Sequence, residues 1–298
     1  MSFPGFLGFA PPQGYQQGSG SGAGSVTITG GPTLNRLSQT NLTAAARAGT
    51  TVTASATAHT VGTYASLIDP TTLVSYGVFL RMKNVAQPVT DTSMLLNLAY
   101  EDTGGGAQTI VAPNVDAGAA TAQAGDQGKL HFFPVLIPTN KRVSAGAQAV
   151  IGGDTVTVAV WLAQDPPNVP DPLPTVFTSY GADTANSRGT SVTPGSGAFG
   201  TWTEIGTTSA AHTQWTLGYD PLSDVTVNTA DIVVEIGAGP NVGAVTTIGT
   251  FGMSTGSAEV VSGPFPLLVY AEVPITTKVW ARIAAADVEP RGIIIYGS

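Results

Sequence analysis

The stretch Ile232-Val-Val-Glu-Ile236 decides the fold, and Met94-Leu-Leu-Asn-Leu98 repeats its pattern 138 residues earlier in the chain. Successive side chains of a β-strand point to opposite faces of the sheet, so the first, third and fifth residues share one face. In both stretches these three residues are large and apolar, whereas the polar Glu235 and Asn97 take the same place on the opposite face. The period of two predicts two equivalent β-strands, each burying one face in a core.

The match between these two stretches extends over most of the chain. Gly49-Thr-Thr-Val-Thr53 corresponds to Gly189-Thr-Ser-Val-Thr193 at an offset of 140, and the offset then decreases to 135 near the C-terminus. Small loop deletions in one copy would produce such a drift, so the ordered series indicates one module duplicated in tandem. The other matched positions are Tyr64 with Trp202, Val89 with Val227, Thr109-Ile110 with Thr247-Ile248, Pro138 with Pro274, Val143 with Val279, and Trp161 with Tyr296.

Period-two alternation recurs elsewhere, most clearly over residues 215–219 and 279–283. Runs rich in Thr, Val and Ile are separated by Gly, Pro, Asn or Asp, which is typical of strands joined by tight turns. Helical periodicity is confined to one short candidate at residues 41–47. We therefore expect an all-β chain with two tandem antiparallel β-sandwich domains of jelly-roll-like architecture.

Two segments of unusual composition divide the chain. Residues 14–24 read GYQQGSGSGAG, which is typical of a flexible linker. Residues 165–174 contain five prolines, which favour an extended, semi-rigid spacer. The expected domains are an N-terminal docking arm with its Gly/Ser linker at 1–35, a first sandwich at 36–165, a Pro-rich linker at 166–175 and a second sandwich at 176–298.

The composition excludes several classes of protein. Only 10% of the 298 residues are charged and 42% are hydrophobic, the reverse of the composition of disordered chains. The net charge of −8, from 11 Lys and Arg against 19 Asp and Glu, offers no basic patch for nucleic acid. The absence of cysteine excludes disulfides, thiolate metal sites and a cysteine nucleophile. Because no apolar run reaches about 18 residues and the N-terminus lacks the charge of a signal peptide, we expect no membrane insertion.

The three histidines, His59, His131 and His212, are not at metal-ligand spacing. We expect surface or turn roles for His59 and His212, and a position at a strand end for His131. A Ser-His-Asp triad would have to be built from abundant residues, and no GxSxG motif is present.

Carboxylates and amides offer three further candidates. Glu101-Asp102 could be a carboxylate pair, but an acidic hairpin tip is the simpler interpretation, because the second copy has Gly-Pro-Asn there. Asp220 and Asp224 supply too few of the six to eight oxygen ligands that Ca²⁺ takes. Asn41 begins an N-glycosylation sequon, Asn41-Leu-Thr43. We expect no catalytic residue, no cofactor and no metal site, and therefore no enzyme.

Aromatic residues of the second copy could form a stacking platform for sugars: Trp202, Trp215, Tyr219 and Trp280. Trp215 shares its strand face with Leu217, which favours a place in the core. Trp280 shares a face with Arg282, opposite the apolar face of its strand, so we expect it to be exposed or at a subunit contact. Trp280 and Arg282 are therefore the candidate contacts for a partner or a glycan.

The stretch RGTSVTPGSGAFGTWTEI, residues 188–205, resembles a pattern found in virion surface proteins of tailed bacteriophages. The similarity continues through residues 231–239, 264–266 and 274–283, and reaches residues 48–165 more faintly through the repeat. The resemblance implies a fibre, tail appendage or head decoration built from β-sandwich modules, and it brings no catalytic residues. The first copy departs from it, with Tyr64 in place of Trp202 and Gly146 in place of Arg282, which puts a shared surface function of the two domains in doubt.

The N-terminal segment carries Phe3, Phe6, Leu7 and Phe9 within seven positions, interrupted by helix-breaking Pro and Gly. Such a segment cannot bury its own apolar surface, so we expect it to dock on another virion protein; a disordered terminus is the alternative.

We expect a non-enzymatic structural protein of a tailed-phage virion, assembled in the host cytoplasm and facing outward as a tail appendage, fibre or head decoration. A carbohydrate- or receptor-binding module on the virion surface is the alternative. The expected partners are other virion proteins, further copies of this chain, and a host surface glycan or receptor under the alternative. Low charge and the absence of disulfides favour a homo-oligomer, and the expectation of a trimer comes from the resemblance alone.

Overall fold

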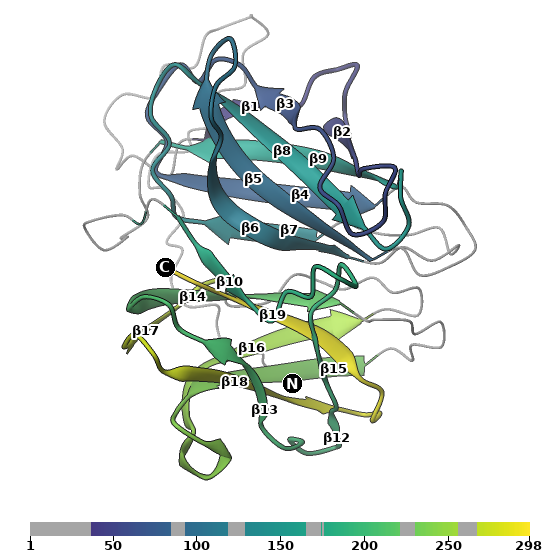
Figure 1. Cartoon of the computed structure of the whole chain (residues 1–298), viewed down its shortest axis with the longest axis vertical. Coiled ribbons are helices and arrows are strands. Elements are labelled where there is room, and N and C mark those ends of the chain that lie inside the picture. The colour runs from purple at the N-terminus through teal and green to yellow at the C-terminus, as the bar shows by residue number, and fades with distance from the viewer. Residues whose placement is uncertain are drawn as a thin grey trace, which may run out of the picture.

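The computed structural model describes residues 37–84, 93–118, 129–164, 174, 176–220, 230–255 and 267–298, and almost all regular structure in them is β-strand (Figure 1). The one helical element of this part is the short 3₁₀ turn η1 (Val242–Ala244). The expectation of an all-β chain built from β-sandwich domains is confirmed. None of the described helical structure is long and apolar enough to cross a membrane.

Residues 41–47 are bends and turns, so the expectation of a helix there is wrong. The side-chain amide of Asn41 holds the start of this segment on a neighbouring strand: Nδ2 donates to the carbonyl of Val158 at 2.8 Å and Oδ1 accepts from the N–H of Val160 at 2.9 Å. The Thr43 hydroxyl then accepts from the N–H of Ala46 at 2.8 Å. Asn41 is thereby bound to β9, and the Thr43 hydroxyl takes the N–H of Ala46, which in an α-helix would donate to the carbonyl of residue 42.

The first sandwich, which we call sandwich 1, consists of two sheets. In sheet I the order is β1-β9-β4-β7, with β2 also pairing with β9; in sheet II it is β3-β8-β5-β6. All of their ladders are antiparallel. The strands are β1 (Leu37–Thr40), β2 (Thr50–Thr53), β3 (Ala65–Ile68), β4 (Gly77–Asn84), β5 (Met94–Asp102), β6 (Thr109–Gly118), β7 (Lys129–Phe133), β8 (Lys141–Ala149) and β9 (Thr155–Ala163).

Sandwich 2 repeats this arrangement. In sheet III the order is β10-β19-β14-β17, with β11 also pairing with β19; in sheet IV it is β12-β18-β15-β16, with β13 also pairing with β18. The short β12 is the addition, and it lies parallel to β18. The strands are β10 (Thr178–Tyr180), β11 (Thr190–Val192), β12 (Gly195–Ser196), β13 (Thr203–Thr207), β14 (His212–Asp220), β15 (Ala230–Ala238), β16 (Thr246–Thr255), β17 (Val269–Val273), β18 (Lys278–Ala285) and β19 (Arg291–Gly297).

The two copies agree in register as well as in strand order. Leu96 of β5 pairs with Ala147 of β8, and Val234 of β15 pairs with Ile283 of β18, so both members of each pair are related by the offsets read from the sequence. The expected inward positions are all at most 1% exposed, which confirms the predicted core faces: Met94, Leu96, Leu98, Ile232, Val234 and Ile236. Among the matched positions, Val89 and Val227 lie outside the described residues.

The two sandwiches are in direct contact (Figure 1). The outer face of sheet III, near β10, β14 and β19, lies against the edge of sandwich 1 formed by β6 and β7. Phe177, Ile294 and Tyr296, which follow the Pro-rich linker in sequence, belong to the apolar core of sandwich 1. The N–H of Phe177 also donates to the carbonyl of Val111 in β6 at 2.7 Å. The core of sandwich 1 is therefore completed by residues of sandwich 2.

Candidate functional site

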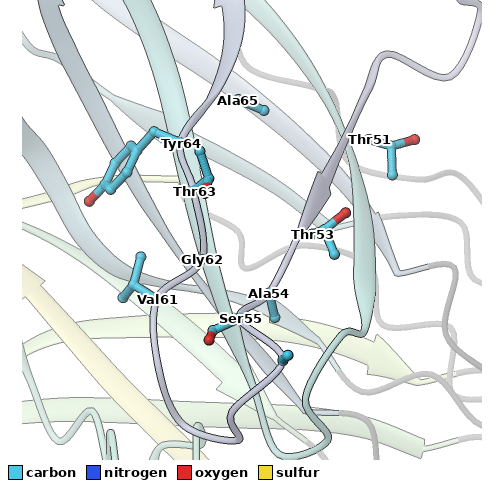
Figure 2. Close-up of a pocket in the computed structure, with 10 residues that line it drawn as sticks. Thr51, Thr53, Ala54, Ser55, Val61, Gly62, Thr63, Tyr64 and Ala65 are labelled. Atoms are coloured by element: carbon cyan, nitrogen blue, oxygen red, sulfur yellow. The ribbon is translucent and has the colours of Figure 1, made fainter.

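A groove of about 560 Å³ opens between β2 and β3 at the edge of sandwich 1 (Figure 2). Its walls come from two chain segments, one continuing from β2 and the other leading into β3. Hydroxyl groups dominate its polar lining, and none of the lining residues is charged. The lining residues are Thr51, Thr53, Ala54, Ser55, Ala56, Val61, Gly62, Thr63, Tyr64 and Ala65.

The two walls of the groove are held by different sheets. On one side, β2 pairs with β9 of sheet I. On the other, the N–H of Gly62 donates to the carbonyl of Ala147 in sheet II at 2.8 Å. A Cβ atom at Gly62 would lie only 2.4 Å from the carbonyl oxygen of Thr53, so glycine is required where the segments come closest. The groove is therefore a fixed opening between the two sheets.

Tyr64 belongs to the wall of the groove that leads into β3, but its ring points away from the opposite wall. In Figure 2, Tyr64 and Val61 point to the same side, away from the strand that carries Thr51 and Thr53. The ring of Tyr64 lies over Gly146, where a Cβ atom would be 2.9 Å from two ring carbons. Its hydroxyl accepts a long hydrogen bond, 3.4 Å, from Nδ2 of Asn97. Tyr64 is half-buried, so part of the ring remains in contact with solvent.

The equivalent position in sandwich 2 is filled by Arg282, which stands where sandwich 1 has Gly146. Its guanidinium carbon lies 4.7 Å from the ring centre of Phe199 and 4.4 Å from that of Trp202. Its Nη2 is 2.6 Å from a carboxylate oxygen of Glu235. Arg282 is half-buried, and its guanidinium already has an ion-pair partner and two aromatic contacts within the chain.

Trp280 is only 7% exposed, so the expectation of an exposed indole is wrong. Its Nε1 donates to the carbonyl of Gly239 at 2.9 Å, because the loop that follows β15 crosses the ring. The ammonium of Lys278 lies 5.8 Å from the centre of the ring. The proposed docking residues Phe3, Phe6, Leu7 and Phe9 lie outside the described residues.

The histidines serve packing and the contact between sandwiches. Nδ1 of His59 lies 3.1 Å from the Ser187 hydroxyl across the two copies. His131 is inside β7 and 2% exposed, and burial, with a further contribution from Lys129, lowers its pKa to about 3. His212 is 4% exposed and its Nε2 lies 2.5 Å from the Tyr180 hydroxyl; burial lowers its pKa. The expectation of a surface or turn role for His212 is wrong, and His131 lies within its strand.

The carboxylate candidates are engaged in ion pairs. Glu101 is 4% exposed and its carboxylate is 2.5 Å from Nη2 of Arg142 on the neighbouring strand, while Asp102 at the end of β5 pairs with Lys141. Asp220 is buried in β14, and Asp224 lies outside the described residues. Among the described residues, no group of three His, Cys, Asp or Glu side chains is placed to hold a metal ion.

A buried polar network at the junction of the sandwiches was not predicted from the sequence. Asp116 of β6 is 0% exposed, and one carboxylate oxygen lies 2.5 Å from Nζ of Lys129 and accepts from the N–H of Tyr219 at 2.9 Å. Lys129 also donates to the carbonyl of Tyr219. The Tyr296 hydroxyl accepts from the N–H of Asp116 at 2.8 Å and donates to the carbonyl of Asn114 at 2.9 Å. Burial raises the pKa of Tyr296, which keeps this hydroxyl neutral.

Comparison with known proteins finds no matching family model and no matching curated protein. Among solved structures, PNGF-II is similar over 84% of this chain and 66% of its own length, with 10% identity and a TM-score of 0.34. This chain thus spans about two thirds of PNGF-II. The N-terminal CBM22-1–CBM22-2 tandem domain of Xyn10C from Paenibacillus barcinonensis is similar over 79% of this chain and 82% of its own, with 12% identity and a TM-score of 0.23. At these values neither likeness assigns a family or a function to the chain.

Proposed function

We propose that the chain is a non-enzymatic structural protein on the outside of a tailed-phage virion, as a fibre, tail appendage or head decoration. The observation that carries the proposal is the junction between the two sandwiches. Tyr296 and Ile294 of sandwich 2 complete the core of sandwich 1, and the Asp116–Lys129 pair is buried beside them. Two domains that share a core move as one body, a property suited to a projecting structural unit.

The resemblance of residues 188–205 to phage surface proteins gives this body its proposed location. The remaining step is attachment, which we assign to Phe3, Phe6, Leu7 and Phe9. Each such side chain contributes roughly 1.5–3 kcal/mol when it is buried against another protein, before ordering costs. The arm leads through the Gly/Ser linker into β1, the first strand of sandwich 1, so docking would leave both sandwiches free to project outward.

Replacement of Phe3, Phe6, Leu7 and Phe9 by Ser tests the attachment while it keeps the length of the arm. The variant should retain the far-ultraviolet spectrum and melting temperature of the full chain, because the apolar clusters of both sandwiches are built from residues of the sandwiches themselves. It should be lost from purified particles, as measured by quantitative mass spectrometry. The matched control changes residues 14–24 to another Gly/Ser sequence of the same length and should be incorporated normally. Normal incorporation of the Ser variant would refute the docking role.

The groove beside Tyr64 favours a second candidate function, binding of a carbohydrate on the host surface. Hydroxyls of Thr51, Thr53, Ser55 and Thr63 can both donate and accept hydrogen bonds, which matches the hydroxyl groups of a sugar. The half-buried ring of Tyr64 lies on the far side of the wall that leads into β3, over Gly146, and offers an apolar surface to the C–H face of a pyranose that extends past this wall. In sandwich 2 the position of Gly146 is taken by Arg282, which Phe199 and Trp202 contact, so we expect the sugar to bind sandwich 1.

A glycan array with the purified full chain tests this candidate. If the groove binds sugars, the Tyr64→Ala variant should lose the signal for every glycan that the wild type retains. Phe199→Ala, the matched change beside Arg282 in sandwich 2, should leave the signal unchanged. An array without any reproducible signal, or a signal that Tyr64→Ala leaves intact, would remove the groove as the binding site.

A further inference from the structure

The outer face of sheet I carries a row of aromatic residues that has no partner among the described residues of sandwich 2. Trp161 of β9 pairs with Phe79 of β4, and Phe79 pairs with Phe132 of β7, so the three side chains lie side by side on one face. The ring centres of Phe79 and Phe132 are 4.4 Å apart. We call these three residues the outer aromatic row. Trp161 and Phe79 are half-buried, and the neighbouring Leu130 is 37% exposed.

The duplication shows how such a face is used within the chain. Sheet III is the equivalent of sheet I, and its residues Tyr296 and Thr216 pair with each other as Trp161 and Phe79 do. Tyr296 and Thr216 are at most 1% exposed, because this face of sheet III lies on the β6–β7 edge of sandwich 1. The same face is therefore an interface in one copy of the module and is open in the other.

The edge that receives this face also has a counterpart. In sandwich 1 it is formed by β6 and β7, and the equivalent strands of sandwich 2 are β16 and β17. Along β16 and β17, Ile248, Val269 and Ala271 pack against the core of sandwich 2 but are only partly buried. Tyr270 on β17 is 54% exposed. We call this surface the β16–β17 edge; it has no second module on it within the described chain.

Charge favours contact between these two surfaces over contact of either with itself. Arg81 and Lys83 lie beside the outer aromatic row and are exposed. Residues 176–298 contain four Lys or Arg and ten Asp or Glu, a net charge of −6, whereas residues 37–164 contain six and seven, a net charge of −1. Two copies of the sheet I face would bring like charges together, whereas sheet I against sandwich 2 brings basic side chains to an acidic module.

We infer that copies of this chain associate head to tail, with the outer aromatic row of one copy seated on the β16–β17 edge of a second copy, in the manner of the junction inside each chain. Such a contact joins two different surfaces, so it forms a closed ring or an open filament according to the rotation between copies. A ring of three copies would meet the expectation of a trimer. The inference concerns surfaces of this chain alone and does not depend on the proposed place in a virion.

Complementation between two variants tests the inference, with the oligomeric state of the full chain measured by sedimentation velocity. Trp161→Glu disrupts the outer aromatic row and Tyr270→Glu disrupts the β16–β17 edge. Each should weaken self-association by roughly thirtyfold or more, as expected at the centre of an interface. An equimolar mixture should form a dimer of one copy of each, because the two copies together retain one intact contact. Val288→Glu, at a residue 57% exposed and distant from both surfaces in sequence, is the matched control and should associate as the wild type does.

Lys83→Glu supports the test in case Trp161→Glu unfolds, since Lys83 is exposed and its substitution leaves the aromatic row intact. It should weaken association and complement Tyr270→Glu in the same way. A wild-type chain that remains monomeric at the highest concentration reached would overturn the inference. The inference would also be overturned if Trp161→Glu lost association while Tyr270→Glu associated as the wild type does, because the sheet I face would then pair with itself.

Discussion

Removal of the Asp116 carboxylate should destabilise the whole chain, because it breaks the ion pair buried between the sandwiches. In Asp116→Ala the Lys129 ammonium, whose side chain is 10% exposed, keeps only the Tyr219 carbonyl, and the N–H of Tyr219 loses its acceptor. Breaking one partner of a buried pair costs about 3–5 kcal/mol. The exposed pair of Lys278 and Glu204 is the matched control, and Lys278→Ala should cost less than about 1 kcal/mol.

Calorimetry and urea unfolding together measure this effect, because a chain of two domains can unfold in more than one step. The wild type should show a single transition, since residues of sandwich 2 complete the core of sandwich 1. Asp116→Ala should show two separated transitions. The double variant with Asp116→Leu and Lys129→Met removes both charges and should return to within about 2 kcal/mol of the wild type. A loss of less than about 1 kcal/mol in Asp116→Ala would refute the reasoning.

Three further predictions concern acid sensitivity, the core and the aromatic stack. Burial lowers the pKa of His131 from 6.5 to about 3. Between pH 6.5 and pH 3 the unfolded state therefore binds more protons than the folded state. The contribution of neutral His131 to the free energy of unfolding is complete above pH 6.5 and decreases as the pH falls towards 3. When the pH is lowered from 6.5 to 4, the free energy of unfolding should therefore decrease by about 3 kcal/mol less in His131→Phe than in the wild type, as measured by urea unfolding at each pH. Ile236→Ala should cost roughly 2–5 kcal/mol in the same assay, whereas Val242→Ala, at a position 56% exposed, should change stability by less than about 0.5 kcal/mol. Arg282→Ala should unstack Phe199 and Trp202, which near-ultraviolet circular dichroism would detect; an unchanged aromatic signal would contradict the observed stack.

The strands and the two cores could be predicted from the sequence because they depend on local alternation. A residue such as Leu96 has large apolar neighbours two positions away on each side, and its equivalent Val234 repeats this pattern. A period of two determines which side chains share a face, and the burial of both residues follows from it. The offset between the copies also correctly related their partners across the sheet, Ala147 and Ile283.

Features that depend on long-range contacts could not be predicted in the same way. Trp280 lies on the outer face of its strand, as expected, but alternation does not show that the loop carrying Gly239 covers that face. Trp161 and Tyr296 were matched in sequence, yet only the structure shows that Tyr296 is the one buried under the other sandwich. A single charge in an apolar strand, such as Asp116 or Lys129, is the sequence signal that could have indicated a buried junction.

The open groove and the filled site illustrate the same limit. The exchange of Arg282 for Gly146 was visible in the aligned copies. Its consequence depends on how the preceding loops fold over each sheet: one brings Phe199 and Trp202 into contact with the guanidinium, and the other places Tyr64 directly on the glycine. Side-chain identity at one position therefore did not reveal the shape of the surface around it.

The central claim, that the chain stands on the outside of a tailed-phage virion, is tested most directly by cryo-electron microscopy of phage particles purified from the source of this chain. The proposal predicts density for the two joined sandwiches on the outer surface of the head or tail, with the first residues of the chain in contact with another particle protein. Absence of that density, together with absence of the chain from the mass spectrum of the same purified particles, would contradict the assignment to the virion.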